Sequence, residues 1–318
     1  MAVADKDASC AERVGEEYNR RGYDDYRQLI QTRFDCLLVA EGLNNCEQYV
    51  RSAMKDGVNI LKLAPAARNF DEAAELVRLA ENHGAKFAVA NPQRFDARFV
   101  EFRRRLRLDS VRRFFLVTAA CFVAERRRPA WQTDVKLAGG GVLLHDCYDI
   151  IDQIVWNFGI PQQIYAVNIS SAGDKQQRLY LTEDTAVVTM SFSDTFIGTL
   201  MVSRACRRPA ERKFIKVYGK EETLTFCGEG LKATEGNGQT NEQLEDGESR
   251  IICMKKVLAS FALSILQPDK NKPPSSAREN LSNMALIEAC YLSARTGFPE
   301  QPARILQMAR FEPTDVCA

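Results

Sequence analysis

The sequence predicts an α/β protein in which an incomplete, doubly wound parallel domain (residues 1–92) precedes an α+β domain (residues 93–318) with a mostly antiparallel sheet. In the first 90 residues, short apolar runs alternate with amphipathic segments, which is typical of strands joined by crossover helices. Farther along, several runs of strand character follow one another without helices between them. A length of 318 residues is enough for two domains of ordinary size.

Four apolar runs in the first part are short, aliphatic and bounded by turn residues, so they are expected to be buried parallel strands. They are AVAD at the start, FDCLLVA at 34–40, VNILKL at 58–63 and KFAVA at 86–90. Between them, residues 45–56 and 69–83 have apolar side chains at helical spacing. Asn69 is placed to cap the second helix, with Glu72 at the capping-box position and Gly84 as the stop.

The second part begins with a basic helix over 94–106 and an extended run at 114–118. A glycine-led amphipathic helix is expected over 139–159, and a last helix over 276–296. The runs of strand character, which predict the mostly antiparallel sheet, are 162–169, 185–192, 195–203, 213–219 and 223–227. The polar, glycine-rich segment 228–249 is expected to be a loop.

Charge and cysteine content narrow the class of protein. Lys and Arg number 43 against 42 Asp and Glu, so a net charge of +1 predicts no nucleic-acid and no membrane partner. No apolar run approaches the roughly 18 residues of a membrane span, and the start MAVADKDASC has no leader pattern. The ten cysteines form no CxxC pair, which argues against a zinc ribbon and favours a reducing compartment. We therefore expect a cytoplasmic protein without a bound metal.

Several strings in the sequence, taken in order, resemble the Gfo/Idh/MocA family of NAD(P)-dependent oxidoreductases, which act on sugars, inositols and related polyols. The strings are VADKD, GVNILKLAPAARNFDEAAELVRLAENHG, NPQRFDARF, GGGVLLHDCYDIIDQIVW, FIKVYGKEETLTF and LIEACYLSARTG. The resemblance covers nearly the whole chain and implies a Rossmann-like first domain that binds NAD, with NADP as an alternative. It also implies hydride transfer to or from a secondary alcohol, and a homodimer or homotetramer formed through the second-domain sheet.

The sequence departs from the family pattern in the phosphate loop, in the Glu-Lys-Pro motif and in the order of the acid and the imidazole on the glycine-led helix. The family's first strand and GxGxxG phosphate loop are missing from the first residues, and Gly15 lies inside a predicted helix. Aligned on Pro65, the family's catalytic Lys falls on Ala64 and its Glu on Leu63. We therefore keep two readings beside the enzyme: a non-catalytic binding or regulatory protein on the same scaffold, and a true start upstream of Met1.

The candidate catalytic residues are His145, Asp149 and Lys62. Aligned on the three glycines, the family's Asp falls on His145 and its His on Asp149, so the two residue types are reversed. On one helix these residues would share a face, and Asp149 would orient the imidazole for acid or base catalysis. Lys62 points to the same side of its strand as Ala64, although pairing with a carboxylate or with solvent is the commoner role for such a lysine. A metal held by His145, Cys147 and Asp149 is disfavoured, because residues two apart do not share a helix face.

The remaining candidates concern cofactor and substrate. Asp5, at the end of the first strand, would accept hydrogen bonds from an adenosine ribose and favour NAD, although a turn or cap is an equally common role for such an Asp. The neighbouring Lys6 would soften that preference. The full set of expected cofactor-binding residues is Asp5, Lys6, Ala40, Leu63 and Pro65. The expected substrate-binding residues are Arg94, Tyr148 and Asp152, with an interdomain salt bridge as the alternative for Arg94.

Overall fold

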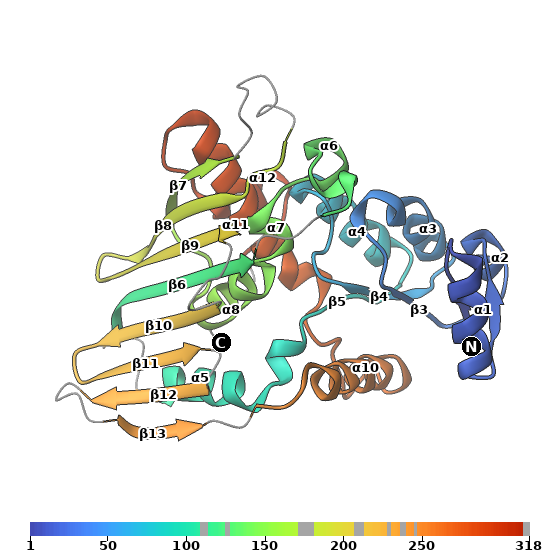
Figure 1. Cartoon of the computed structure of the whole chain (residues 1–318), viewed down its shortest axis with the longest axis horizontal. Coiled ribbons are helices and arrows are strands. Elements are labelled where there is room, and N and C mark those ends of the chain that lie inside the picture. The colour runs from blue at the N-terminus through green and yellow to red at the C-terminus, as the bar shows by residue number, and fades with distance from the viewer. Residues whose placement is uncertain are drawn as a thin grey trace.

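The structure is a computed structural model that describes residues 1–108, 114–124, 128–170, 181–206, 213–227, 230–235, 240–244 and 247–313. Figure 1 shows short strands and helices on the N-terminal side and a broad sheet on the other side. The first sheets are parallel and the broad sheet is mostly antiparallel, which confirms the predicted fold class. Among the described helices, none is long and apolar enough to cross a membrane.

The parallel strands of the first domain fall into two separate sheets. One sheet pairs β1 (Ala2–Ala4) with β2 (Arg21–Tyr23). The other has the order β3 (Cys36–Val39), β4 (Asn59–Leu63) and β5 (Phe87–Ala90). Within the described part of the chain, no ladder joins the two sheets. The four predicted strands are present, and β2 is the additional one.

Both faces of the three-stranded sheet are covered, but by helices from distant parts of the chain. Helices α3 (Leu43–Lys55) and α4 (Phe70–Asn82) share one core with Ile60, whose neighbours along β4 point to the opposite face. That opposite face packs against α10 (Arg250–Leu266), where Leu61 joins a second core. The crossover helices therefore supply one layer, and the second domain supplies the other.

Residues 1–35, called the N-terminal unit below, contain β1, β2, α1 (Ala8–Glu17) and α2 (Tyr26–Ile30). The chain packs closely here, because a Cβ on Gly15 would lie 2.7 Å from the carbonyl oxygen of Arg20. The rings of Tyr26 and Tyr49, 4.9 Å apart, join the unit to α3. In Figure 1 the unit lies beyond β3, whose Leu38 side chain is 49% exposed.

The second domain is built on an eight-stranded sheet with the order β13-β12-β11-β10-β6-β9-β8-β7. Its neighbours are antiparallel except for β6 and β9, which run parallel. The bounds are β6 (Phe114–Ala124), β7 (Gln163–Ile169), β8 (Thr185–Ser193), β9 (Phe196–Cys206), β10 (Lys213–Gly219), β11 (Glu222–Cys227), β12 (Gly230–Glu235) and β13 (Thr240–Leu244). β12 and β13 lie within 228–249, so the prediction of a loop over that whole segment was wrong.

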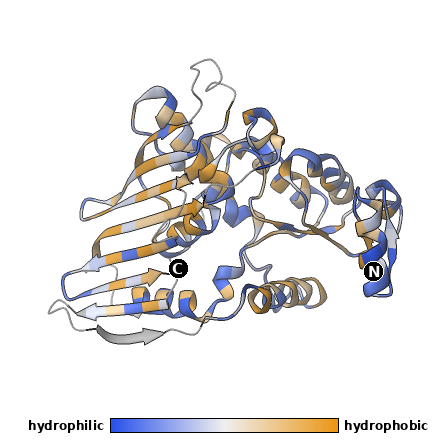
Figure 2. Ribbon diagram, viewed as in Figure 1, coloured by the Kyte–Doolittle hydropathy of each residue, from blue (hydrophilic) through white to orange (hydrophobic). Residues whose placement is uncertain are grey.

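Helices cover one face of this sheet. They are α7 (Val142–His145), α8 (Tyr148–Phe158) and α11 (Ala277–Thr296), and they share the main core with the inward side chains of the strands. The expected single helix over 139–159 was wrong, because the helical segment is interrupted at Asp146 and Cys147, between α7 and α8. Figure 2 shows hydrophobic residues running along both the strands and these helices.

Shorter elements connect the two domains and close the fold. The basic segment predicted as one helix is a 3-10 turn followed by a helix. The remaining elements are η1 (Pro92–Phe95), α5 (Ala97–Leu108), η3 (Ala130–Gln132), α6 (Val135–Ala138) and α12 (Pro302–Met308).

Candidate functional site

The expected cofactor-binding residues lie at the carboxyl ends of the parallel strands. Asp5 and Lys6 follow β1 and are exposed, and Ala40 follows β3 and is exposed. Leu63 ends β4 and is half-buried, whereas Pro65 beyond it is buried. One carboxylate oxygen of Asp5 accepts a hydrogen bond from the Asp7 amide at 2.9 Å. Ligands of open α/β sheets bind along this edge, so the placement suits a cofactor.

Lys62 is sealed beneath the same edge. Its side chain is 2% exposed, and its ammonium donates a hydrogen bond to the carbonyl oxygen of Pro65 at 2.9 Å. Burial lowers the pKa of Lys62, and the neighbouring Cys46 and Glu72 partly offset that effect. The buried amine is held by a backbone carbonyl in this structure, so its role as a substitute catalytic lysine stays a prediction. Neither solvent nor a hydrogen-bonded carboxylate satisfies it.

Asp149 occupies the junction between the two domains. Its carboxylate accepts hydrogen bonds from Lys213 at 2.7 and 2.6 Å and from the Gln93 amide at 3.1 Å. Gln93 belongs to η1, directly after β5, and Lys213 begins β10 of the broad sheet. The side chains of Asp149 and Lys213 are 24% and 35% exposed. The structure thus joins three distant segments around an ion pair that solvent can reach.

The groups around Lys213 keep its amine protonated. Burial alone would lower the pKa of Lys213, but the Asp149 carboxylate and the thiols of Cys121 and Cys147 raise it above its ordinary value. The ammonium also donates a hydrogen bond to the carbonyl oxygen of Asp146 at 3.0 Å. Lys213 was missed by the sequence analysis, because 64 residues separate it from Asp149 and no local pattern marks it.

His145 and Asp149 do not form the expected pair. They lie on different helices, and the imidazole Nε2 lies 3.0 Å from the carbonyl oxygen of Ala138. The ring also packs edge-on against Trp131 at 5.7 Å. Burial lowers the pKa of His145 to about 4, so the ring is neutral at neutral pH. The prediction that Asp149 orients this ring was wrong, because the break between α7 and α8 removes their shared helix face.

The three expected substrate-binding residues form a buried network instead. Arg94 donates hydrogen bonds to both oxygens of Asp152 at 2.7 and 2.9 Å and to Glu279 at 2.8 Å. The Tyr148 hydroxyl donates a hydrogen bond to Asn280 at 2.9 Å. The side chains of Arg94 and Asp152 are 8% and 1% exposed. Protein groups already occupy the polar atoms of these residues, and Arg94 forms a buried ion pair with Asp152, so their substrate roles stay predictions.

A buried carboxylate fixes the glycine turn before α7. Glu183 accepts hydrogen bonds from the backbone amides of Gly141 at 2.7 Å and Leu143 at 3.0 Å, and from the Tyr291 hydroxyl at 3.0 Å. Burial raises the pKa of Glu183, and the hydrogen bonds from the Leu143 amide and the Tyr291 hydroxyl offset only part of that rise. A Cβ on Gly141 would lie 1.9 Å from the Glu183 carbonyl oxygen, which explains the glycine. Glu183 therefore positions the segment that leads into the domain junction.

Asp5 is an exposed carboxylate directly after β1, and Ala40 and Leu63 lie at the carboxyl ends of β3 and β4. A carboxylate at such a strand end is the kind of group that accepts hydrogen bonds from a ribose. The first 91 residues contain no GxGxxG string, so we assign no residue to the phosphates. Within the described ranges, no group of three His, Cys, Asp or Glu side chains is placed to hold a metal ion.

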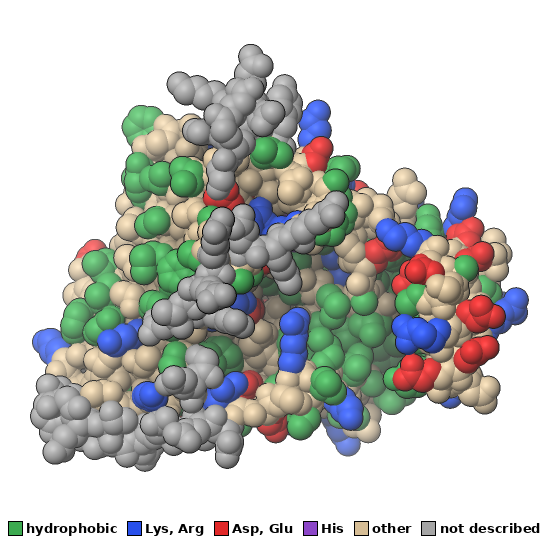
Figure 3. All heavy atoms as spheres, in the orientation of Figure 1, with side chains coloured by type: hydrophobic (Ala, Val, Ile, Leu, Met, Phe, Trp, Pro, Cys, Tyr) green, Lys and Arg blue, Asp and Glu red, His purple; other side chains and the backbone are tan. Residues whose placement is uncertain are grey.

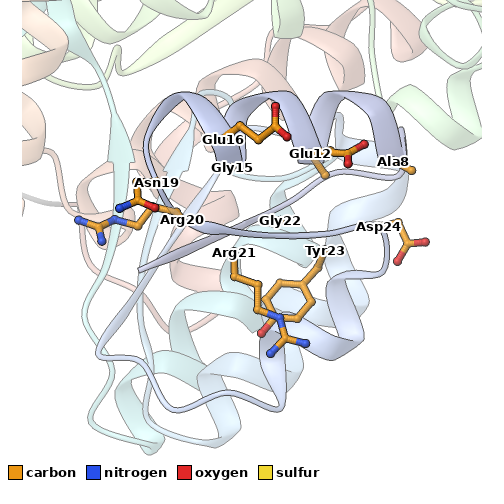
Figure 4. Close-up of a pocket in the computed structure, with 11 residues that line it drawn as sticks. Ala8, Glu12, Gly15, Glu16, Asn19, Arg20, Arg21, Gly22, Tyr23 and Asp24 are labelled. Atoms are coloured by element: carbon orange, nitrogen blue, oxygen red, sulfur yellow. The ribbon is translucent and has the colours of Figure 1, made fainter.

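A separate hollow lies in the N-terminal unit, between α1 and β2. Figure 4 shows Glu12 and Glu16 on the helix and Arg20 and Arg21 on the strand side of this hollow. None of the expected site residues lines it. The Arg21 guanidinium lies over the Tyr23 ring at 4.8 Å, so its charge is partly engaged there. By contrast, Figure 3 shows hydrophobic side chains gathered where β3 and β4 lie in Figure 1.

Comparison with protein families supports a dinucleotide-binding reading of the edge. Residues 1–91 match the NAD-binding Rossmann fold of an oxidoreductase family, named GFO_IDH_MocA. Residues 109–300 match the C-terminal alpha/beta domain of the same family. No curated protein sequence matches the chain.

Solved structures share the fold at low sequence identity. An oxidoreductase from Agrobacterium radiobacter, in complex with NAD+, L-tartaric acid and magnesium, is 18% identical with a TM-score of 0.81; 96% of this chain and 92% of that chain are covered. An aldose-aldose oxidoreductase from Caulobacter crescentus, complexed with glycerol, is 17% identical with a TM-score of 0.78, covering 95% and 91%. A levoglucosan dehydrogenase, in complex with NADH and levoglucosan, is 14% identical with a TM-score of 0.78, covering 95% and 89%.

Proposed function

The chain belongs to the Gfo/Idh/MocA family of oxidoreductases, and we propose that it transfers a hydride between NAD and a secondary alcohol of a sugar, inositol or related polyol. The observation that carries this proposal is the ion pair of Asp149 and Lys213 at the domain junction. The pair lies beside the sheet edge through Gln93 and is partly exposed. Alcohol oxidation needs a titratable group where the hydroxyl proton leaves, and this pair meets that need.

The names of two similar proteins support the proposed substrate class. The aldose-aldose oxidoreductase and the levoglucosan dehydrogenase act on sugars by name, and both share the fold. Hydroxyl-rich ligands need donors and acceptors at the site, which Asp149, Lys213 and Gln93 offer.

When bound, NAD supplies the hydride acceptor at its nicotinamide ring. Asp5 would hold the adenosine ribose, with Lys6 beside it, and Ala40, Leu63 and Pro65 would border the path to the nicotinamide. A carboxylate at Asp5 would accept hydrogen bonds from the two ribose hydroxyls and repel a 2′-phosphate, which favours NAD over NADP. Asp149 would face the reacting hydroxyl of the substrate.

We further propose a homodimer or homotetramer in the cytoplasm. The sheet face away from the helices carries exposed apolar side chains on β7 to β9. They are Tyr165, Val167, Ile169, Val187, Ile197 and Met201. Such a face on a single copy is typical of an interface. The cysteines of the described residues are free thiols, which suits a reducing compartment. Light scattering of the parent and of Val167→Glu tests the assembly, which the substitution should dissociate.

The activity is tested by adding NAD or NADP and a panel of sugars, inositols and polyols, and following the absorbance of reduced nicotinamide. Calorimetry of NAD binding to the same protein accompanies it. Turnover of at least one alcohol that is lost in Asp149→Ala, with NAD still bound, is the expected result. Binding of NAD or a sugar without turnover of any alcohol would contradict the proposal and support a binding protein on this scaffold.

A further inference from the structure

Lys213 has features of a proton donor as well as of a structural lysine. Its ammonium contacts both carboxylate oxygens of Asp149 at 2.6 and 2.7 Å and the carbonyl oxygen of Asp146 at 3.0 Å. Yet its side chain is 35% exposed, so solvent or a ligand reaches it. An ammonium that only balances a buried charge would be expected away from solvent. Here one side of the charged group is held and the other is open.

The location of Lys213 connects it to the edge where β4 and β5 end. Leu63, the last residue of β4, pairs with Ala90, the last residue of β5. Gln93 follows three residues after Ala90 and donates a hydrogen bond to the same carboxylate that holds Lys213. Ala64 is the exposed residue directly after β4. The Asp149 carboxylate therefore links the Lys213 ammonium to Gln93, which follows the carboxyl end of β5.

We propose that Lys213 is a catalytic residue, the group that gives a proton to the substrate oxygen in ketone reduction and takes it back in alcohol oxidation. This rests on the proposed function. The exposed residue directly after β4 is Ala64, which carries no proton donor. Lys213 at the start of β10 would supply the ammonium that this edge lacks.

In reduction, the carbonyl carbon gains a hydride from reduced nicotinamide and its oxygen gains a proton. That proton leaves Nζ of Lys213, so an N–H bond breaks as the O–H bond forms, and the amine is left neutral. Its exposed side then regains a proton from water. In oxidation each bond change runs in reverse, and the neutral amine accepts the hydroxyl proton.

The other candidates lack a proton to give at this place. Asp149 is an acceptor for three donors, namely Lys213, Gln93 and the Ile150 amide. His145 is neutral, with Nε2 facing the Ala138 carbonyl. Lys62 is sealed in the core.

The charges around Lys213 decide whether the site favours ketone reduction or alcohol oxidation at a given pH. The groups that face it are the Asp149 carboxylate on α8, the Cys121 thiol on β6 and the Cys147 thiol between α7 and α8. Together they outweigh burial and raise the pKa of Lys213. The amine is therefore charged at neutral pH, which favours donation of a proton. Ketone reduction should be fast at neutral pH, and alcohol oxidation should rise as the solution becomes more alkaline.

Lys213→Met tests the role, with Lys216→Met as a matched control on the same strand. Lys216 lies over the Tyr218 ring at 4.8 Å. Lys213→Met should slow ketone reduction roughly 10² to 10⁴-fold with unchanged NADH affinity, and the control should retain the parent rate. Lys213→Arg keeps the positive charge but gives up its proton far less readily, so it should not restore the rate. Thermal melts show whether each variant is folded.

A second measurement does not depend on activity. Lys213 is acylated with acetic anhydride over a range of pH, and mass spectrometry gives the pH dependence of its modification in the parent and in Asp149→Asn. Loss of the carboxylate should move the reactive range to lower pH, and the range for Lys216 should not move. An unmoved range for Lys213 would overturn the proposal, because the ion pair would not hold its proton.

The outcomes separate this proposal from the function on which it rests. Turnover by the parent that Lys213→Met retains would overturn the role of Lys213 and leave the oxidoreductase standing. Turnover that Lys213→Arg fully restores would show a purely electrostatic role and also overturn it. No turnover by the parent on any alcohol or ketone would overturn both. Loss of turnover in Lys213→Met alone, with NADH binding and folding intact, is the result that supports it.

Discussion

Removal of Arg94 should destabilise the protein strongly without a specific effect on substrate binding. Arg94 is 8% exposed and holds Asp152, which is 1% exposed, through two hydrogen bonds of 2.7 and 2.9 Å. In Arg94→Leu, the Asp152 carboxylate would keep the hydrogen bond that the Asn283 amide donates at 2.8 Å. Removing one partner of a buried ion pair lowers the free energy of unfolding by about 3 to 5 kcal/mol, because the other charge stays buried without its partner.

The other contacts of Arg94 add little to that figure. Glu279 is 32% exposed and regains water when its partner leaves, so its loss adds about 0 to 1 kcal/mol. The guanidinium lies 5.4 Å from the Trp156 ring, a contact that contributes about 1 kcal/mol. We therefore expect Arg94→Leu to lower the free energy of unfolding by about 4 to 7 kcal/mol.

Urea unfolding followed by tryptophan fluorescence measures this loss, with Arg104→Leu as the control. Arg104 is 55% exposed and pairs with Glu101 on the surface of α5, so its loss should cost less than about 1 kcal/mol. In Arg94→Leu with Asp152→Leu, much of the loss should return, because no buried charge is left unpaired. A fall in stability no larger than that of Arg104→Leu, together with a raised KM for the alcohol, would refute this reasoning and return Arg94 to the substrate site.

Three further predictions concern pH, cofactor choice and the backbone. The imidazole of His145 stays neutral in the folded protein down to about pH 4, but in the unfolded chain it is protonated below about pH 6.5, so the free energy of unfolding falls as the pH drops through that window. In urea unfolding at the two ends of the window, His145→Gln should remove about 3 kcal/mol of this fall. An unchanged pH dependence would contradict the prediction. Asp5→Ala should weaken NAD binding by about 1 to 3 kcal/mol and NADP binding less in calorimetry, whereas equal losses would assign Asp5 to its turn. Gly139→Ala should lower the free energy of unfolding by more than about 2 kcal/mol, because its φ is +79° and a Cβ would lie 2.0 Å from the Arg68 carbonyl oxygen; Gly84→Ala, with a φ of +67° and open space, should cost about 1 kcal/mol.

Local sequence patterns predicted much of the fold. The apolar runs at 58–63 and 86–90 became β4 and β5, because a strand buried on both faces needs aliphatic side chains at successive positions. Asn69 caps α4 as expected, since its side chain accepts a hydrogen bond from the Glu72 amide at 2.9 Å. The Glu72 carboxylate accepts a hydrogen bond from the Arg68 guanidinium at 2.8 Å. It does not form the second hydrogen bond of a capping box, which would come from the Asn69 amide.

The misses have a physical cause in common: contacts across long sequence distances. α10 has apolar residues on two sides, with Val257 buried and Leu258 39% exposed, which hides any one-sided pattern. The break before α8 interrupts no hydrophobic period, so the sequence reads as a single helix there. Which charged residues are buried depends on partners far along the chain, as for Arg94 and Asp152. The same holds for the contact of Lys213 with Asp149.

The division of the parallel strands into two sheets also has a consequence for local opening. β1 has β2 as its ladder partner, and the rings of Tyr26 and Tyr49 are a contact that ties the N-terminal unit to α3. β4, in contrast, is paired on both sides and lies between two cores. The N-terminal unit should therefore open as a separate cooperative segment, at a free energy well below that of global unfolding. Its backbone amides would exchange with deuterium while those of β4 stay protected, so the protein would have two tiers of hydrogen exchange.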